Sequence, residues 1–342
     1  METIWFCLLM FMLGTYVVLG GTDLGVGILH LCVARNETKR QQVIRSIRPV
    51  WKPNEVWLIA AGGTLFLAFP TALAVSFSGF YLALMLVLWL LVLRGLGLEL
   101  RYQLPDVLWR QFWDVAVSAS SLLLALCLGA ALGNVVRGVP LDEHGVFFEP
   151  LWTNFRVGDQ TGILDWYTML VGLAAVVALA NHGALWLNAC VEGDVRDRAN
   201  RLAARLGVAL IALLIALHGA SFVARPEFRD GLSARPWGVV FPVAAVGGVA
   251  AALVWRRRGK AWRAYFASCT ALYAMLATAT VSVYPDILPA RVPTYALSIE
   301  MAAAPRSGLV DALYWWIPGI IIVGAYFTYI HTKLPKTIRE DG

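Results

Sequence analysis

The sequence predicts an all-α integral membrane protein with about nine transmembrane helices. Hydrophobic residues make up 59% of the 342 residues and charged residues only 15%, whereas about a quarter of the residues in a soluble domain are charged. The mean hydropathy is +0.67. The apolar residues fall into runs of about 20, the length that a helix needs to cross a hydrocarbon core. We therefore expect a single transmembrane domain that covers residues 1–342.

Nine segments are long and apolar enough to cross a membrane. They lie at 4–32, 54–75, 77–100, 112–135, 163–190, 203–224, 238–255, 262–284 and 309–331. The first begins after Glu2 and lacks both a basic leader region and a small-residue cleavage site, which predicts a retained helix and not a signal peptide. The segment 238–255 contains Pro242 and many Ala and Gly residues, so its signal is the least regular.

The lysines and arginines are divided unequally between alternate loops. Twenty-one of the 28 lie in the first, third, fifth and seventh loops, beside these loops, or in the C-terminal tail. Basic loops stay on the cytoplasmic side of a membrane, so we expect the N-terminus outside and the C-terminus in the cytoplasm. The net charge of +6 therefore reflects membrane orientation and gives no indication of nucleic-acid binding.

A short internal similarity suggests a repeat. A shift of 158 residues pairs five positions of the first helix and loop with five positions of the fifth helix and loop: Asp23, Gly25, Cys32, Val33 and Arg40 with Asn181, Gly183, Cys190, Val191 and Arg198. A parallel repeat of this kind would give half-repeats 1–135 and 163–284. The fold would then be two four-helix units plus one peripheral helix, 309–331. Chance similarity explains so short a match equally well.

Four ionisable residues near one membrane edge are candidates for proton transfer: Asp23, Glu99, Glu55 and Lys52. A carboxylate inside a membrane is costly, which makes it a candidate for function. Small residues surround Asp23 and allow another helix to approach, so we expect its side chain to face protein. A hydrogen bond to a neighbouring helix would explain Asp23 equally well.

The other acids also have simple structural explanations. Glu99 lies between Arg94 and Arg101 at a predicted helix end, where an interfacial ion pair accounts for it. Glu55 follows Pro53 in the predicted first turn of a helix, where the helix dipole favours a carboxylate.

Three further polar or aromatic residues are candidates for interfaces or packing: Asn54, Trp57 and His182. Asn54 and Trp57 are three residues apart and share one helix face, and a tryptophan at this depth usually anchors a helix at the lipid headgroups. His182 lies deep enough to ligate haem, but a packing histidine bonded to a neighbour is the preferred interpretation. The five cysteines form no CxxC pair, so we expect neither disulfides nor a metal site.

Several ordered stretches together resemble subunit II of the cytochrome bd quinol oxidases. They are TDLGVG at 22–27, NEVWLIAAGG at 54–63, FSGFY at 77–81, GN at 133–134 with GVP at 138–140, HGA at 182–184, YP at 284–285 and LP at 288–289. No single stretch is diagnostic, but their order and spacing cover nearly the whole chain.

The resemblance implies a haem-free accessory subunit in the inner membrane of a bacterium. Its partner would be a homologous subunit I, which carries haem b and haem d, oxidises quinol and reduces dioxygen. This chain would stabilise subunit I and contribute a proton route from the cytoplasmic side, but would not be catalytic alone. The family also leaves room for small single-helix subunits and for a bound quinone or lipid.

One position departs from the family pattern. The family often has an acid directly after the tryptophan at position 51, where this chain has Lys52, and a lysine does not relay protons as a carboxylate does. Two other function classes stay open at this point. They are a secondary transporter, whose helices would be broken at matched positions of the two repeats, and a purely structural membrane scaffold.

Overall fold

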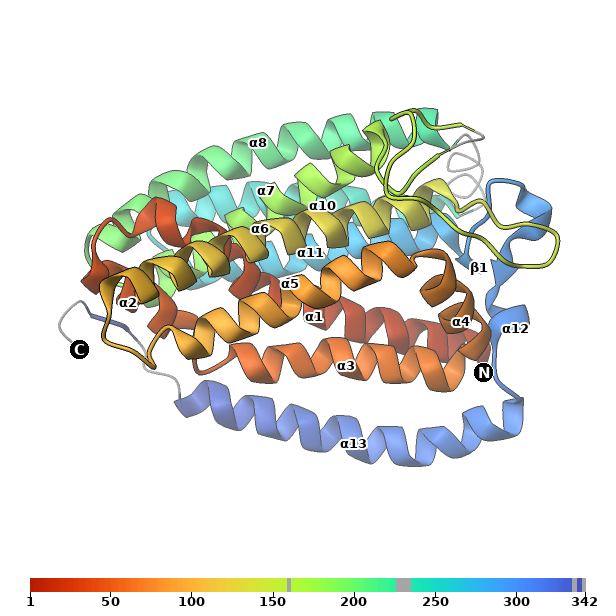
Figure 1. Ribbon diagram of the computed structural model, residues 1–342, viewed down its shortest axis with the longest axis horizontal. Helices are drawn as coiled ribbons and strands as arrows, with labels where there is room; N and C mark the ends of the chain where they lie inside the picture. Colours follow the sequence, from red (N-terminus) through yellow and green to blue (C-terminus); the bar gives the residue numbers. More distant parts are fainter. Residues whose placement is uncertain (159–160, 226–234, 334–336, 340–342) are drawn as a thin grey trace.

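The computed structural model is a bundle of long helices that run side by side along its longest axis (Figure 1). The structure describes residues 1–158, 161–225, 235–333 and 337–339, without the side chains of His331 and Lys333. The long helices are α1 (Glu2–Val33), α3 (Trp51–Ala68), α5 (Tyr81–Leu100), α6 (Val107–Arg137), α7 (Trp166–Cys190), α8 (Asp194–Ala224), α10 (Val240–Arg257), α11 (Ala261–Val283) and α13 (Arg306–Lys333). The prediction of an all-α membrane protein is confirmed.

Among the described residues, eight helices are long and apolar enough to cross a membrane, or nine if α3 and α4 (Pro70–Gly79) form one bent span. Eight of the nine predicted spans each match one of these helices along most of their length. The irregular segment 238–255 forms α10, with Pro242 in its first turn, where proline is tolerated. The grouping into two four-helix units stays a prediction.

The continuous helix predicted over 54–75 is wrong. The chain breaks at Phe69, and α3 and α4 meet at an angle of 116°. Pro70 is the first residue of α4; proline lacks the backbone N–H that would continue the helix, and its ring clashes with the preceding turn. The predicted span 77–100 is shortened at its start, because α4 extends to Gly79 and α5 begins only at Tyr81.

The two ends of the bundle differ in structure. The basic end carries α2 (Glu37–Ile47) and the turns that join α5 to α6, α7 to α8 and α10 to α11 (Figure 1). The helix α2 was not expected from the sequence. Asn36 caps it by accepting a hydrogen bond from the Lys39 backbone N–H at 3.0 Å, and the helix buries Val43, Ile44 and Ile47.

The loop end carries the longer connections, residues 138–165 and 284–305. It includes a two-stranded antiparallel sheet of β1 (Asp286–Leu288) and β2 (Leu297–Ser298), the short helix α12 (Ile299–Ala302), and the 3-10 turns η1 (Pro236–Val239) and η2 (Pro293–Tyr295). Of the basic residues counted in the sequence, Arg229 and Lys336 lie outside the described residues.

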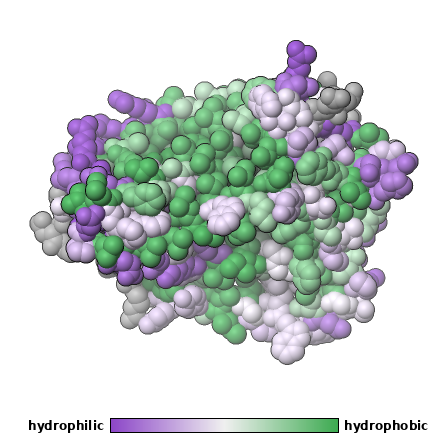
Figure 2. All heavy atoms as spheres, in the orientation of Figure 1, coloured by the Kyte–Doolittle hydropathy of each residue, from purple (hydrophilic) through white to green (hydrophobic). Residues whose placement is uncertain are grey.

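The helices α1 and α7 form the centre of the bundle, and their backbones touch at two glycines. A Cβ atom added to Gly25 would lie 1.9 Å from the carbonyl oxygen of Leu179, and one added to Gly183 would lie 2.3 Å from the Gly25 carbonyl carbon. Outer helices leave apolar side chains exposed, and Figure 2 shows mainly hydrophobic surface between the two ends. Such a surface fits contact with lipid or with another membrane subunit.

Candidate functional site

Asp23 lies inside the bundle, about two-thirds of the way along α1. Its side chain is fully buried, as the small residues around it predicted. The Asn54 side chain on α3 donates one hydrogen bond to Asp23 Oδ2 at 2.8 Å and another to the carbonyl oxygen of Leu19 at 3.1 Å. The second carboxylate oxygen of Asp23 and the side-chain oxygen of Asn54 accept no hydrogen bond from any described residue. Asp23 is therefore held in place but keeps one oxygen available.

Glu55 and Arg94 form an ion pair between α3 and α5. Arg94 Nη1 donates to Glu55 Oε1 at 2.6 Å, and the Arg94 side chain is only 2% exposed. The interpretation of Glu55 as a helix-terminal acid is wrong, because α3 begins at Trp51 and Glu55 falls in its second turn. Asp23 on α1, Glu55 on α3 and Arg94 on α5 are far apart in the sequence, and the packing of these three helices brings them close together.

Tyr16 connects the ion pair with Asp23. The side chains of Glu55, Arg94 and Asp23 all interact electrostatically with Tyr16 on α1, and Arg94 and Glu55 interact in the same way with Asp23. Two guanidinium nitrogens of Arg94 have no hydrogen-bond partner within the described part of the chain. We call these five residues the inner acid cluster: Tyr16, Asp23, Asn54, Glu55 and Arg94.

Lys52 and Glu99 lie outside the inner acid cluster, at the basic end. Lys52 Nζ approaches Glu99 Oε1 to 3.1 Å, and their side chains are 63% and 38% exposed. An ion pair for Glu99 is present as expected, but its partner is neither Arg94 nor Arg101. The geometry joins Lys52 to Glu99 and shows no direct contact between Glu99 and Asp23 among the interactions of the described residues.

Trp57 is a packing residue inside the bundle. It is 7% exposed, and its ring lies 6.1 Å from that of Phe11 on α1 and 5.5 Å from that of Phe327 on α13. The expectation of an anchor at the lipid headgroups is wrong for this reason. Asn54 is buried on the same side of α3, so the predicted shared face is confirmed.

His182 is fully buried and uses both ring nitrogens. Its Nε2 lies 2.9 Å from Thr22 Oγ1 and 3.1 Å from the Val18 carbonyl oxygen, and its Nδ1 lies 2.7 Å from Ser268 Oγ. The Tyr265 ring stacks on the imidazole with a centroid distance of 4.8 Å. This arrangement fits the packing interpretation and leaves neither ring nitrogen free to ligate a haem iron.

A second buried cluster, which sequence reasoning missed, lies where α2 meets α1 and α6. Asp114 accepts hydrogen bonds from His30 Nε2 at 2.7 Å, from Arg101 Nε at 2.6 Å and from Arg40 Nη1 at 3.3 Å. Arg101 also pairs with Glu37 at 3.0 Å. Asp114 is an acid in the predicted span 112–135. The rule that an ionisable residue inside a membrane span is a functional candidate, which selected Asp23, would also have selected Asp114. We call these residues the α2 ion cluster.

The charges of the α2 ion cluster compensate one another. Burial lowers the pKa of the Arg101 guanidinium, but the hydrogen bond from Arg101 to Asp114 and the charges of Asp114 and Glu37 outweigh this effect, so the pKa is raised overall. Arg101 is therefore firmly cationic and holds Asp114. This cluster fits a structural role in fixing α2 on the bundle.

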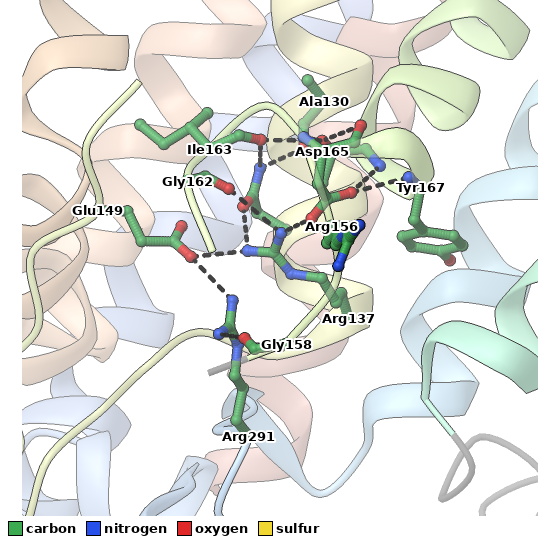
Figure 3. Close-up of polar contacts among 12 residues, drawn as sticks. Ala130, Arg137, Glu149, Arg156, Gly158, Gly162, Ile163, Asp165, Tyr167 and Arg291 are labelled. Carbon is green, nitrogen blue, oxygen red and sulfur yellow. Dashed lines mark hydrogen bonds and ion pairs between the residues drawn. The ribbon is translucent and has the colours of Figure 1, made fainter. Parts of the chain in front are cut away.

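A third cluster joins the loop end to α6 and α7 (Figure 3). Arg137, at the end of α6, donates to Glu149 Oε1 at 2.7 Å and to Asn134 Oδ1 at 2.6 Å, and it pairs with Asp165, the N-cap of α7. Arg291 reaches the same Glu149 oxygen at 3.4 Å. Burial raises the pKa of the Glu149 carboxyl, although the charges of the two arginines oppose the shift. We call this cluster the loop-end clamp.

These clusters contain no arrangement of metal ligands. Among residues 1–158, 161–225, 235–333 and 337–339, no three His, Cys, Asp or Glu side chains gather closely enough to hold a metal ion. The inner acid cluster can instead hold or pass a proton, because it places a carboxyl group, a phenol and an ion pair together inside the membrane-spanning bundle.

Comparison with known proteins decides the family. The family model for cytochrome bd terminal oxidase subunit II matches residues 1–334. The chain belongs to this family. It is therefore a subunit of a terminal oxidase, and it is similar to curated relatives along nearly its whole length.

Two relatives illustrate the similarity of this subunit II. The probable cytochrome oxidase subunit 2 of Haemophilus influenzae is 30% identical over 97% of this chain and 93% of its own length. The cytochrome bd-I ubiquinol oxidase subunit 2 of Escherichia coli K12 is 29% identical over 99% and 95%. The solved bd oxidase from Geobacillus thermodenitrificans has the same fold, with a TM-score of 0.76 at 17% identity over 96% of this chain and 97% of the solved one.

Proposed function

We propose that this subunit II is a haem-free accessory subunit of a quinol-oxidising, oxygen-reducing complex, and that its inner acid cluster carries protons toward a haem-bearing subunit I. Asp23 is the observation that carries the proposal. It is fully buried and lies beside the Glu55–Arg94 ion pair, and within the described part of the chain one of its two carboxylate oxygens accepts no hydrogen bond. An ionisable group kept in such a costly position is a functional candidate.

The route would run from the basic end inward. Lys52 and Glu99 form an exposed ion pair between α3 and α5, and Glu55 and Arg94 form a buried pair between the same two helices. Lys52 and Glu55 are one turn apart on α3. A proton taken up near Glu99 would pass the Glu55 carboxylate and reach Asp23. The positive charge of Lys52, which pairs with Glu99, would influence this uptake. Buried polar atoms normally form hydrogen bonds with protein or with ordered water. We therefore expect water molecules to bridge the distances between the side chains of this route.

The partner would bind across α3, α5 and α13. These helices expose large apolar and aromatic side chains, among them Trp89 (68%) and Trp315 (84%). The inner acid cluster joins α1 to α3 and α5, so Asp23 on α1 would lie one helix layer behind this surface. A subunit I bound here would receive protons by the shortest path. The relatives named ubiquinol oxidases support quinol as the electron donor of the complex.

We propose that the haems of the complex belong to subunit I. Both ring nitrogens of His182 are engaged within this chain. His218 Nδ1 bonds the Leu214 carbonyl oxygen at 2.6 Å, whereas its Nε2 has no partner among the described residues. The ring lines an apolar cavity of only about 180 Å³, below the roughly 300–1,000 Å³ of typical small-molecule sites. The proposed orientation keeps the N-terminus outside and the basic end in the cytoplasm of the bacterial inner membrane.

The test replaces Asp23 with Asn in the assembled oxidase. Asp23→Asn keeps the hydrogen-bonding shape but cannot bind and release a proton, so we expect oxygen-reducing turnover and proton uptake to fall by roughly tenfold or more. Glu55→Gln should give a smaller loss, and Glu99→Gln the smallest. Turnover is measured with an oxygen electrode and proton uptake with a pH indicator.

Asp194→Asn is the matched control, because Asp194 is an exposed acid at the same end that pairs only with Lys39 among the described residues. It should leave turnover unchanged. Equal turnover and proton uptake in Asp23→Asn and Asp194→Asn, with haem absorption intact, would reject the proton route and favour a purely structural scaffold. The transporter alternative requires matched broken helices, and in the described second half no helix pair is bent like α3 and α4.

A further inference from the structure

The inner acid cluster contains two carboxyl groups but only one cation. Asp23 and Glu55 are the acids, and both interact with the guanidinium group of Arg94. Lys52, one turn from Glu55 on α3, is paired with Glu99 instead. If both acids of the cluster were ionised, one negative charge inside the bundle would lack a compensating cation. An unpaired buried charge is costly, so the cluster becomes neutral when one of the two acids is protonated.

The contacts of the two acids decide which one is ionised. Arg94 Nη1 donates to Glu55 Oε1 at 2.6 Å, and such a charge-assisted hydrogen bond favours the ionised acid. Asp23 forms no ion pair with any described residue, and its donor is the neutral amide of Asn54. The Glu55 side chain is also 20% exposed, whereas Asp23 is fully buried. These contacts favour an ionised Glu55 and a protonated Asp23.

The orientation of the Asn54 side chain supports the same assignment. Its nitrogen donates to the carbonyl oxygen of Leu19 at 3.1 Å and to Asp23 Oδ2 at 2.8 Å. A carbonyl oxygen only accepts, so the Leu19 contact determines which amide atom is the nitrogen. Both N–H groups are then used, and neither Asn54 Oδ1 nor Asp23 Oδ1 has a donor among the described residues. A proton on Asp23 Oδ1 would supply a donor within this pair of side chains, whereas an ionised Asp23 would leave both oxygens as acceptors.

Among the described residues, no second cation compensates Asp23 from the other helices around it. Tyr16 of α1 and Tyr265 of α11 interact electrostatically with Asp23, but a phenol carries no positive charge. On α7, the ring nitrogens of His182 bond to other groups. On α6, Asp114 is itself an acid and is compensated within the α2 ion cluster. The two acids of the inner acid cluster therefore share the charge of Arg94.

We propose that the inner acid cluster holds one resident proton, on Asp23, while Arg94 keeps Glu55 ionised and Asn54 orients the protonated carboxyl group. This proposal rests on the proposed function, because it specifies where the same cluster holds the proton that it would transfer. Delivery of this proton to the partner leaves Asp23 ionised, and the next proton from the basic end restores the neutral acid. Arg94 and Asn54 are positioning residues, since they act through the two acids.

Infrared spectroscopy of the assembled oxidase at about pH 7 tests the proposal, because carboxyl groups in water are ionised at this pH. A protonated carboxyl group has a C=O stretching band that a carboxylate lacks. Labelling the side-chain carboxyl carbon of aspartate with ¹³C shifts this band for Asp23 but not for Glu55. We expect the unaltered complex to have a label-sensitive acid band that disappears in Asp23→Asn. Other buried acids of the complex should give the same bands in every variant.

Further variants test the shared charge. Glu55→Gln removes the acid that Arg94 compensates, so Arg94 should then stabilise an ionised Asp23, and the label-sensitive band should be lost although Asp23 is present. Arg94→Gln removes the cation, so Glu55 should also be protonated, and a second acid band that is insensitive to the label should appear. Arg94→Lys keeps the positive charge and should not show this second band. A merely structural role of Arg94 would not produce this pattern.

Asp194→Asn is the matched control, because Asp194 is an exposed acid at the basic end that pairs with Lys39. It should leave all acid bands unchanged. A label-sensitive band of equal strength in Asp23→Asn and Asp194→Asn would overturn the proposal, as would identical acid bands in Glu55→Gln and the unaltered complex. These two comparisons decide the matter even if Arg94→Gln fails to assemble, and haem absorption verifies the assembly of each variant.

The infrared band and the turnover separate this proposal from the proton route. If Asp23→Asn loses turnover but not the band, the resident proton is rejected and the route is kept. If Asp23→Asn loses the band but keeps full turnover and proton uptake, the route is rejected and the resident proton is kept.

Discussion

Buried charged residues serve different purposes in the three clusters, and their hydrogen bonds distinguish these purposes. In the α2 ion cluster, Asp114 accepts bonds from His30 and from two arginines, so its charge is compensated on all sides. In the inner acid cluster, Asp23 has one bond from Asn54 and an oxygen without a partner in the described chain. A fully bonded carboxylate is fixed in its charged state, whereas a partly bonded one can exchange a proton.

The loop-end clamp allows a pH-dependent test at the residue scale. The pKa of Glu149 in the folded protein is raised by burial, against the charges of Arg137 and Arg291. When folding raises the pKa of a carboxyl group, that group stabilises the folded protein fully at pH values below its pKa in the unfolded chain. This stabilisation is lost as the pH rises through the pKa of the group in the folded protein. Arg137→Gln removes a charge that lowers this pKa, so it should shift the loss of stability to higher pH.

We therefore expect Arg137→Gln to lower the Tm of the purified complex more at about pH 7.5 than at about pH 5, because protonated Glu149 does not need the arginine. Differential scanning fluorimetry at both pH values measures the difference. Arg156→Gln is the control, since Arg156 is an exposed arginine of the same loop. An equal Tm loss at both pH values would contradict the assigned role of Glu149.

At the scale of elements, the bundle depends on one close helix crossing and one break. The crossing of α1 and α7 at Gly25 and Gly183 brings the two backbones into contact, which only glycine permits. The break between α3 and α4 turns the chain by 116° and directs α4 across the loop end. The crossing glycines are also two of the positions that the proposed 158-residue repeat aligns, although the half-repeats themselves stay a prediction.

Gly25→Ala should disrupt the bundle. The added Cβ would lie 1.9 Å from the Leu179 carbonyl oxygen and 2.8 Å from the Gly183 nitrogen, and backbone atoms cannot move aside as a side-chain end can. We expect the Tm to fall by about 5 °C or more, or the complex to fail to assemble. Gly219→Ala is the control, because nothing lies within 4 Å of its added Cβ. A Tm for Gly25→Ala at or above that of Gly219→Ala would reject the crossing as a close-packing point.

At the scale of the whole molecule, charge and shape divide the protein into two ends and a broad apolar middle. The basic end carries most lysines and arginines together with α2, and the loop end carries the clamp and the small sheet (Figure 1). Figure 2 shows hydrophobic surface between them. This division predicts the membrane orientation and leaves the outer faces of α3, α5 and α13 for a partner or for lipid.

The orientation can be tested with single cysteines in a variant that lacks the five native cysteines. Arg257→Cys lies at the basic end and His144→Cys at the loop end, where the His144 side chain is 79% exposed. A maleimide that cannot cross membranes should label His144→Cys in intact cells and Arg257→Cys only after the cells are opened. The reverse labelling pattern would invert the proposed orientation and move the proton entry to the outer side.

The sequence determined the class of fold, most helix positions and the family, because hydrophobic runs of membrane length and an ordered set of motifs are local properties of the chain. It also indicated that Asp23 is buried, since the small residues beside it are its neighbours in sequence. It could not pair charges across helices. The partner of Glu99 is Lys52, the partner of Arg94 is Glu55, and Asp114 accepts hydrogen bonds from His30 and two arginines that are far apart in the sequence.

Only the tertiary structure decided these pairings, because which faces of α1, α3, α5 and α6 meet depends on how all the helices pack together. The same holds for Trp57, whose depth depends on the approach of α13. The energy of a buried charge depends on its neighbours in space. Composition therefore determined which residues are costly to bury, and packing decided which of them are compensated.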